Sequence, residues 1–263
     1  MRNYLISLLG LTWLAGSVVL PRASVAEETS GIRTALDDTG QYFTSPLRWD
    51  AEDWTYFGVT AVVVAAAREA DPTVRSHFAT GSNAALNGGK DKNSLRDAAP
   101  ALALIGGTWA AAGYLGQSEG YSETWRLVEA GVFSTVTAEG LTYAAGRERP
   151  DGTTSPNRWR AGGDSFPSVH ASAAFAIGMT FAESGNDEYR WIRRIVGYGI
   201  AAGTAYVRVK DNLHWASDAV AGAAIGLATA RFVLNRENGT SHGDLSFQPQ
   251  KGGWTLSYNV PLH

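Results

Sequence analysis

Apolar residues recur with a helical period along most of the chain, which predicts a helical protein. Clusters of Gly, Pro, Asn and Asp separate the alanine-rich apolar segments, which cover residues 54–68, 94–115, 121–149, 168–183, 187–207 and 214–235. The alternation that is typical of strands begins only at Leu245, where two such runs flank Lys251-Gly252-Gly253. We therefore expect an all-α fold, a compact bundle of about six core helices, followed by a short C-terminal β-hairpin.

The N-terminal segment has the pattern of a secretory leader. Arg2 precedes an apolar run over residues 4–20, and Ser24-Val25-Ala26 places small residues where a signal peptidase cleaves. We expect cleavage after Ala26 and export to the periplasm. The chain then divides into a signal peptide (1–26), a helical domain (27–238) and a hairpin tail (239–263). The alternative is a retained N-terminal anchor, because the apolar run approaches spanning length.

The remaining apolar runs bear on whether the protein crosses a membrane. The uncharged runs 54–67 and 195–207 are too short to span, and 98–118 reaches spanning length only by including Pro100 and four glycines. The mean hydropathy of the chain is -0.13. These features favour a soluble bundle that makes peripheral contact with a membrane, with an integral multi-span protein as the alternative.

Charge and cysteine content exclude some classes of function. The formal charge is -3, and loss of Arg2 and Arg22 with the leader would make it more negative. An acidic chain of this kind is not expected to bind nucleic acid. The chain has no cysteine, so it has neither disulfides nor a thiol nucleophile.

The stretch from Arg208 to Asp218 carries candidate chemistry. His214 and Asp218 are four residues apart, which predicts one helical face on which the carboxylate accepts one ring N–H and leaves the other nitrogen free to attack. Arg208 adds a planar guanidinium that suits a phosphate group. A neutral imidazole can attack phosphorus and form a phosphohistidine that water then hydrolyses. The segment therefore indicates a phosphate-processing site.

Two further segments supply partners for this site. In Arg147-Glu148-Arg149-Pro150 the proline ends a helical pattern and fixes Arg149 at a helix end. The alternative is that both arginines only complement the helix dipole.

In Pro167-Ser168-Val169-His170, Ser168 is a good N-cap. Free N–H groups at Ser168 and Val169 would face an anion, while His170 can protonate a leaving alkoxide. The alternative is that Ser168 only caps the helix and His170 only packs.

Together the three segments resemble the signature motifs of the type 2 phosphatidic acid phosphatase and vanadium-dependent haloperoxidase superfamily. Those motifs are Lys, six residues and Arg-Pro; Pro-Ser-Gly-His; and Ser-Arg, five residues, His, three residues and Asp. The resemblance covers residues 142–218 and implies an all-α catalytic core. It implies His214 as nucleophile, Asp218 as its partner and His170 as acid and then base. It also implies Arg149 and Arg208 as phosphate ligands, with no metal or other cofactor.

The chain departs from the motifs at three positions. Thr142 stands where the family has its first lysine, Val169 replaces the glycine, and Val207 replaces the serine before the arginine. A charge-assisted hydrogen bond contributes about 1.5 to 3 kcal/mol, so loss of the lysine can cost roughly tenfold to a hundredfold unless another cation compensates. The candidate cations are Arg147, Arg160 and Lys210. Val169 would be strained if its position required a positive φ.

We expect an exported, metal-independent phosphatase that acts on phosphate monoesters or on the terminal phosphate of a lipid pyrophosphate. Its partner would be a phosphorylated small molecule or a lipid headgroup. Three alternatives remain. In the first, the same residues hold vanadate in a peroxidase. In the second, His170, His214 and Asp218 bind a metal. In the third, the site binds phosphorylated headgroups without turnover.

Overall fold

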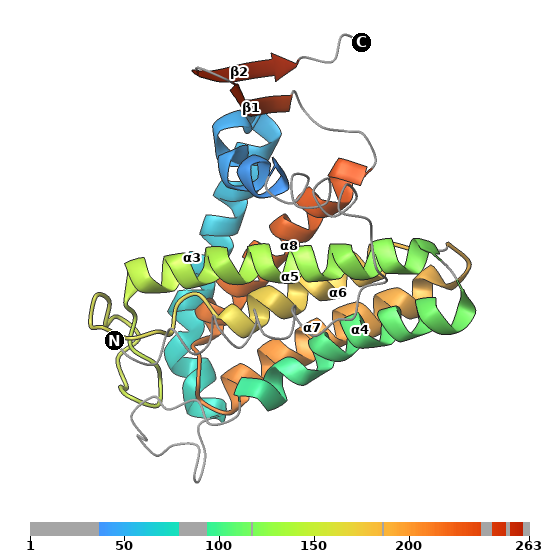
Figure 1. The fold of residues 1–263 in the computed structure, drawn as a ribbon. Coiled ribbons are helices and arrows are strands. Elements are labelled where there is room, and N and C mark those ends of the chain that lie inside the picture. The colour runs from blue at the N-terminus through green and yellow to red at the C-terminus, as the bar shows by residue number, and fades with distance from the viewer. Residues whose placement is uncertain are drawn as a thin grey trace. The chain divides into compact units, whose positions relative to one another are not determined.

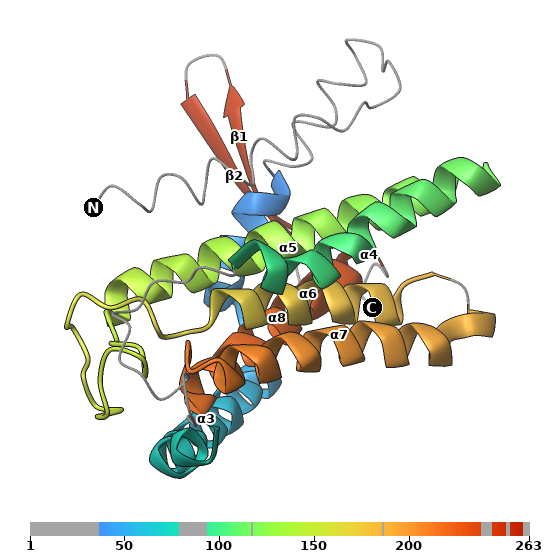
Figure 2. The same cartoon turned by 90° about the horizontal axis from the view of Figure 1, so that it is seen from below.

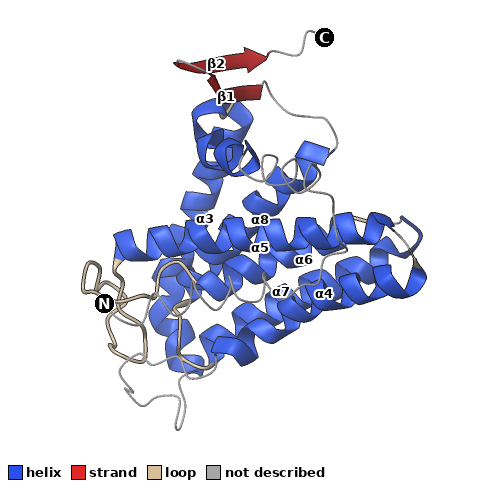
Figure 3. Ribbon diagram, viewed as in Figure 1, coloured by secondary structure: helices blue, strands red, loops and turns tan. Residues whose placement is uncertain are grey.

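The computed structural model describes residues 37–78, 94–116, 118–185, 187–237, 244–250 and 253–259. Contacts divide the chain into two units, and the six long helices of the described residues lie in the larger unit, Pro46–Asp244 (Figure 1). They are α3 (Ala51–Phe78), α4 (Ser94–Leu115), α5 (Ser118–Ala145), α6 (Val169–Glu183), α7 (Arg190–Lys210) and α8 (Ala216–Glu237). The predicted all-α fold is confirmed for the described residues of this unit, nearly all of which are helical except those of the long loop between α5 and α6 (Figure 3).

Short elements complete the description. The 3-10 helices are η1 (Ser45–Arg48) and η3 (Asp187–Tyr189). The smaller unit includes the helix over residues 37–44 and most of two paired strands, β1 (Asp244–Gln250) and β2 (Gly253–Asn259). The turn between the strands lies outside the described residues, as do the predicted leader and its cleavage site, so the C-terminal hairpin and the three-part division of the chain stay predictions.

Three predicted helix boundaries were wrong. α3 continues past residue 68 to Phe78, with Pro72 inside it. α5 ends at Ala145 rather than Arg149, because Gly146 adopts a left-handed φ of 54°. The N–H of Gly146 donates a hydrogen bond to the carbonyl oxygen of Thr142 at 2.9 Å. α8 begins at Ala216, so His214 lies in the loop before it rather than on the helix.

α6 lies at the centre of the bundle and packs against α5, α7 and α8 (Figures 1 and 2). Its small residues let neighbouring backbones come close. A Cβ added at Gly178 would lie 2.4 Å from the carbonyl oxygen of Gly197 on α7, so only glycine fits this crossing. Apolar side chains fill the space around it, and the buried cluster consists of Ala101, Leu104, Leu127, Ala174, Ile177 and Ala201.

Two described helices are long and apolar enough to cross a membrane, over Leu95–Leu115 and Ala216–Arg236. The second is half buried, as expected of a core helix, whereas only 17% of the α4 window is buried. The α4 window includes Pro100, as the sequence indicated for a span in this region. Large apolar side chains are also exposed on α3 and α7, among them Trp54, Phe57, Trp191 and Ile195. Apolar surface of this extent is typical of contact with a membrane or a partner.

Candidate active site

The predicted site residues come from helix ends that meet at two loops. Ser168 caps α6, Arg208 lies in the last turn of α7, and Asp218 lies in the first turn of α8. The loops that precede α6 and α8 lie at the same end of these helices (Figure 2). Backbone hydrogen bonds join them, including Ser168 N–H to Asp218 O at 3.0 Å. Residues far apart in the sequence thus form one cluster.

The imidazole of His214 is held at both nitrogens. Nδ1 lies 2.7 Å from the carbonyl oxygen of Ser165, and Nε2 lies 3.1 Å from Nη2 of Arg208. A carbonyl only accepts and a guanidinium only donates, so the proton sits on Nδ1 and Nε2 keeps its lone pair. The ring is buried. His214 therefore presents an unprotonated nitrogen next to a fixed cation.

Asp218 does not hold His214 in the way that the sequence predicted. Its Oδ2 is 3.8 Å from Nδ1 of His214, which is too long for a hydrogen bond, and the predicted shared helical face was wrong because His214 lies in a loop. The carboxylate instead accepts from Ser165 Oγ, from Trp215 N–H at 2.9 Å and from Arg147. Asp218 and His214 are thus linked through Ser165, which contacts both.

Arg147 is fully buried and belongs to the support of the site. Nη1 donates to Asp218 and to Ser217 Oγ, and Nη2 donates to Asp71 Oδ2 at 2.7 Å. Nε and Nη2 also donate to the carbonyl oxygen of Pro156. This guanidinium is engaged by protein groups on every nitrogen, so it does not replace the missing family lysine as a phosphate ligand.

The sequence interpretation missed Asp71, which ties α3 to the site. Its Oδ1 accepts from Ser217 N–H at 2.9 Å and its Oδ2 accepts from Ser217 Oγ at 2.6 Å, in addition to the pair with Arg147. It is almost completely buried. The local sequence gives no signal of this role, because the partners lie 76 and 146 residues away.

Asp97 is the second missed residue. Its Oδ2 accepts from Nη1 of Arg208 at 3.0 Å, and both side chains are buried. Asp97 also pairs with Arg96, which reaches Asp211 at the end of α7. A lone carboxylate near the start of the apolar segment 94–115 was an available signal, since buried acids are normally paired. Asp97 fixes the arginine that faces His214.

Arg149 lies in the loop after α5 and pairs with Asp164 through two hydrogen bonds, at 2.7 and 3.1 Å. Glu139 on α5 is near this pair: burial raises the pKa of Glu139, Asp164 raises it further, and Arg149 lowers it. The sequence interpretation missed both carboxyl groups. The guanidinium of Arg149 therefore faces an acidic neighbour that an incoming phosphate would have to displace.

The motif around α6 is confirmed in part. Ser168 is the N-cap and accepts from Ala171 N–H, and Val169 is the first helical residue. Among the described non-glycine residues only Arg160 and Asn212 have a positive φ, so the strain considered for Val169 does not arise. The hydroxyl of Thr142 is buried and donates to Pro167 O at 3.3 Å, which joins two of the motifs.

Burial and neighbouring cations set the protonation of the site. Burial lowers the pKa of His214 well below its ordinary value, and Arg208, Arg149 and His170 lower it further, whereas the Ser165 carbonyl raises it. His170 and His214 thus lie within electrostatic range of each other. Burial raises the pKa of Asp218 to about 7, against the opposing effect of Arg147 and the other donors.

The chemistry of the site does not require a metal ion to hold an anion, because two arginines and a helix N-terminus are present. Within the described residues, no three His, Asp or Glu side chains are grouped as metal ligands would be. The structure therefore does not assemble His170, His214 and Asp218 into a metal-binding set.

Comparison with known proteins agrees with the motifs. Residues 123–239 match the model of the PAP2 superfamily. A lipid A 1-phosphatase of Porphyromonas gingivalis is 35% identical over 120 residues, which make up 46% of this chain and 22% of that protein. The chain thus aligns with about a fifth of the length of this relative. No solved structure matches the chain. All three motifs, from Thr142 to Asp218, fall inside the region that is similar to the PAP2 superfamily.

Proposed function

We propose that the protein is a phosphatase that removes phosphate from a lipid through a phosphohistidine at His214. The observation that carries the proposal is the lone pair of Nε2, which faces Arg208 while Nδ1–H is held by Ser165 O. A nucleophile needs an unprotonated nitrogen beside groups that stabilise the negative charge of the transition state. The Nε2 lone pair accepts from Arg208, and it is released for attack when a phosphoryl oxygen takes over that donor. The PAP2 match and the lipid A 1-phosphatase relative support this class of reaction.

In the first step, Nε2 of His214 attacks phosphorus and the bond from phosphorus to the ester oxygen breaks. The leaving alkoxide takes a proton from His170, and Arg149 and Arg208 hold the phosphoryl oxygens. The imidazole becomes cationic as the N–P bond forms. The carboxylate of Asp218 accepts a hydrogen bond from Ser165 Oγ and lies 3.8 Å from Nδ1, where its negative charge offsets that cation.

In the second step, water attacks phosphorus from the side opposite His214 and the N–P bond breaks. His170, now neutral, accepts the proton of that water, and inorganic phosphate leaves. The site then returns to its starting protonation. Neither step needs a metal ion as Lewis acid, since the arginines supply the positive charge.

The lipid substrate and membrane association are part of the proposal. Support comes from the relative that acts on lipid A and from the weakly buried α4. We propose that the protein works at a membrane surface, with the reaction on the periplasmic side if the predicted leader directs export. Phosphate monoesters and lipid pyrophosphates both fit the chemistry, because each presents a terminal phosphoryl group.

The test is trapping of the intermediate. Wild type, His214→Gln and His77→Gln would be mixed with phosphatidate that carries a radiolabel in its phosphate group, in the presence of a chelator. The reactions would be quenched in alkali, which preserves phosphohistidine. His77 is an exposed histidine on α3 and serves as the matched control. Label on wild type and on His77→Gln, with none on His214→Gln, is the expected result. Full turnover by His214→Gln would refute the mechanism, and tight phosphate binding without hydrolysis would indicate a binding protein.

A further inference from the structure

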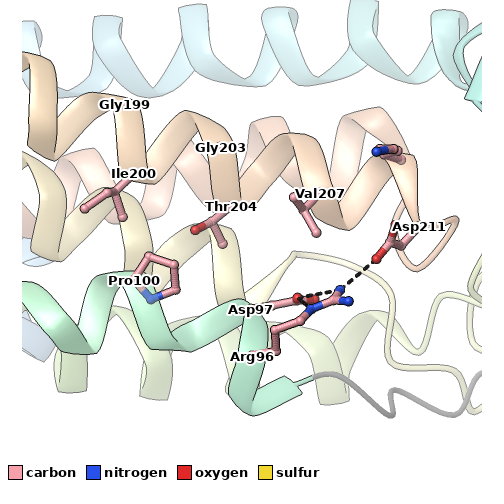
Figure 4. Close-up of a pocket in the computed structure, with 10 residues that line it drawn as sticks. Arg96, Asp97, Pro100, Gly199, Ile200, Gly203, Thr204, Val207 and Asp211 are labelled. Carbon is pink, nitrogen blue, oxygen red and sulfur yellow. Dashed lines mark hydrogen bonds and ion pairs between the residues drawn. The ribbon is translucent and has the colours of Figure 1, made fainter.

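A groove between α4 and α7 lies next to the proposed active site. It has a volume of about 540 Å³, within the range of small-molecule sites. Asp97 and Pro100 line it from α4, and Ile200, Thr204 and Val207 point into it from α7 (Figure 4). None of these groups takes part in the proposed reaction steps. The groove therefore needs an explanation of its own.

The groove connects to the nucleophile through Asp97. One side of Asp97 lines the groove, and its Oδ2 binds Arg208, which contacts Nε2 of His214. Thr204 and Ile200 lie four and eight residues before Arg208 on α7. At 1.5 Å per residue, the groove therefore extends about 6 to 12 Å along α7 from the phosphate end. A ligand with a phosphate at one end and a chain at the other matches this layout.

The wall of the groove is apolar along its length and charged at one end. Pro100, Ile200 and Val207 supply apolar surface, whereas Arg96 pairs with Asp97 and Asp211 at one end (Figure 4). Lys210 also lines the groove. Two glycines of α7, Gly199 and Gly203, keep the groove open, since a Cβ added to either would meet no atom within 4 Å. A polar end close to Arg208 and an apolar channel beyond it suit an amphiphile whose phosphate is held at the active site.

We propose that the groove between α4 and α7 binds the hydrocarbon chain of the lipid phosphate whose phosphoryl group reacts at His214. The proposal rests on the proposed function and adds to it the part of the protein that selects for a lipid. Exposed apolar residues continue on both helices, with Leu95 and Trp109 on α4 and Ile195 on α7. Gly199 and Gly203 are specificity-determining positions.

The test separates chain binding from chemistry. Butyl- to dodecylphosphonate would be measured as competitive inhibitors of p-nitrophenyl phosphate hydrolysis, because the carbon–phosphorus bond resists hydrolysis. In wild type, each methylene that enters the groove should lower the inhibition constant roughly threefold to fourfold. Gly203→Leu and Gly199→Leu fill the groove and should remove most of this dependence while changing p-nitrophenyl phosphate turnover less than about twofold.

Gly140→Leu is the matched control. Gly140 is an exposed glycine of α5 with no atom within 4 Å of an added Cβ, and it lies outside the groove. It should behave as wild type, and thermal melting would show that all variants are folded. Two substitutions on successive turns keep the test decisive if one of them perturbs the fold.

Other outcomes would overturn the proposal. A wild-type chain-length dependence in both groove variants would place the hydrocarbon elsewhere. No dependence in wild type, with a change of oligomeric mass in Gly203→Leu, would assign the groove to a second copy of the chain. If wild type lacks phosphatase activity, calorimetric titration with the same phosphonates still tests the groove, so failure of the proposed function and failure of this inference are distinguishable.

Discussion

Oδ2 of Asp71 lies 2.7 Å from Nη2 of Arg147, and both side chains are completely buried. The pair connects α3 to the N-terminus of α8, because Arg147 also binds Asp218 and Asp71 also binds Ser217. Two tryptophan rings cover the guanidinium, with centroids 4.6 Å (Trp159) and 5.4 Å (Trp215) from its central carbon. A cation in such a position is stable only when its carboxylate partners are in place.

Asp71→Asn should therefore be strongly destabilising, since it leaves a buried cation with one carboxylate fewer. We expect the free energy of unfolding to fall by about 3 to 5 kcal/mol, measured by urea denaturation. Glu69→Gln is the control, because Glu69 is exposed on the same helix and pairs only at the surface with Arg68. It should cost less than about 1 kcal/mol. Equal stability of the two variants would contradict the assigned role of Asp71.

Asp97→Asn should weaken phosphate binding, because Asp97 fixes the guanidinium of Arg208 against His214. Loss of one charge-assisted hydrogen bond corresponds to roughly tenfold or more in affinity. We expect the inhibition constant for inorganic phosphate and KM to rise by that factor. Asp211→Asn, which removes a part-exposed partner of Arg96, should leave both nearly unchanged. A larger effect at Asp211 than at Asp97 would be inconsistent with the structure.

The pH dependence of the reaction should follow Asp218. Burial raises the pKa of Asp218 to about 7, and the ionised form offsets the cation that forms on His214. The pKa of His214 is lowered well below its ordinary value, so the nucleophile is neutral throughout this range. We expect kcat/KM to rise with pH through about 7, until loss of the His170 proton that the leaving group needs limits it. In Asp218→Asn this rise should disappear from the residual activity, whereas Asp211→Asn should keep it.

The same groups predict opposite effects on stability. The lowered pKa of His214 means that the folded state resists protonation of this ring. The contribution of neutral His214 to the free energy of unfolding is therefore present above pH 6.5 and is lost as pH falls. The raised pKa of Asp218 means that its contribution is present below pH 3.8 and is lost as pH rises towards about 7. Below pH 6.5, denaturation curves should therefore show a smaller loss of stability for His214→Gln than for wild type. An identical pH dependence would show that His214 protonates freely in the fold.

Gly178→Ala should disrupt the crossing of α6 and α7, because the added Cβ would lie 2.4 Å from the carbonyl oxygen of Gly197. A backbone carbonyl cannot move aside as a flexible side chain can. Overpacking of this kind lowers the free energy of unfolding by about 1 to 3 kcal/mol. Gly140→Ala is the control: it meets nothing and should stabilise α5 by up to about 1 kcal/mol. Thermal melting of both variants would test the difference, and a wild-type melting temperature for Gly178→Ala would count against so close a crossing.

The sequence by itself predicted the long helices and a set of candidate site residues. Helical periodicity placed the long segments, since an apolar stripe on a helix is a local property of the chain. The spacing of Arg149, Ser168 and His214 carried the chemistry, because each motif is a short stretch whose residue types are visible in order.

The tertiary structure decided what holds those residues. Asp71, Asp97 and Ser165 reach the site from other elements, and no local pattern shows which distant partner a carboxylate or carbonyl will meet. It also decided that His214 bonds the Ser165 carbonyl rather than Asp218. That choice depends on where α8 begins, at Ala216, because a histidine outside the helix does not share a helical face with Asp218.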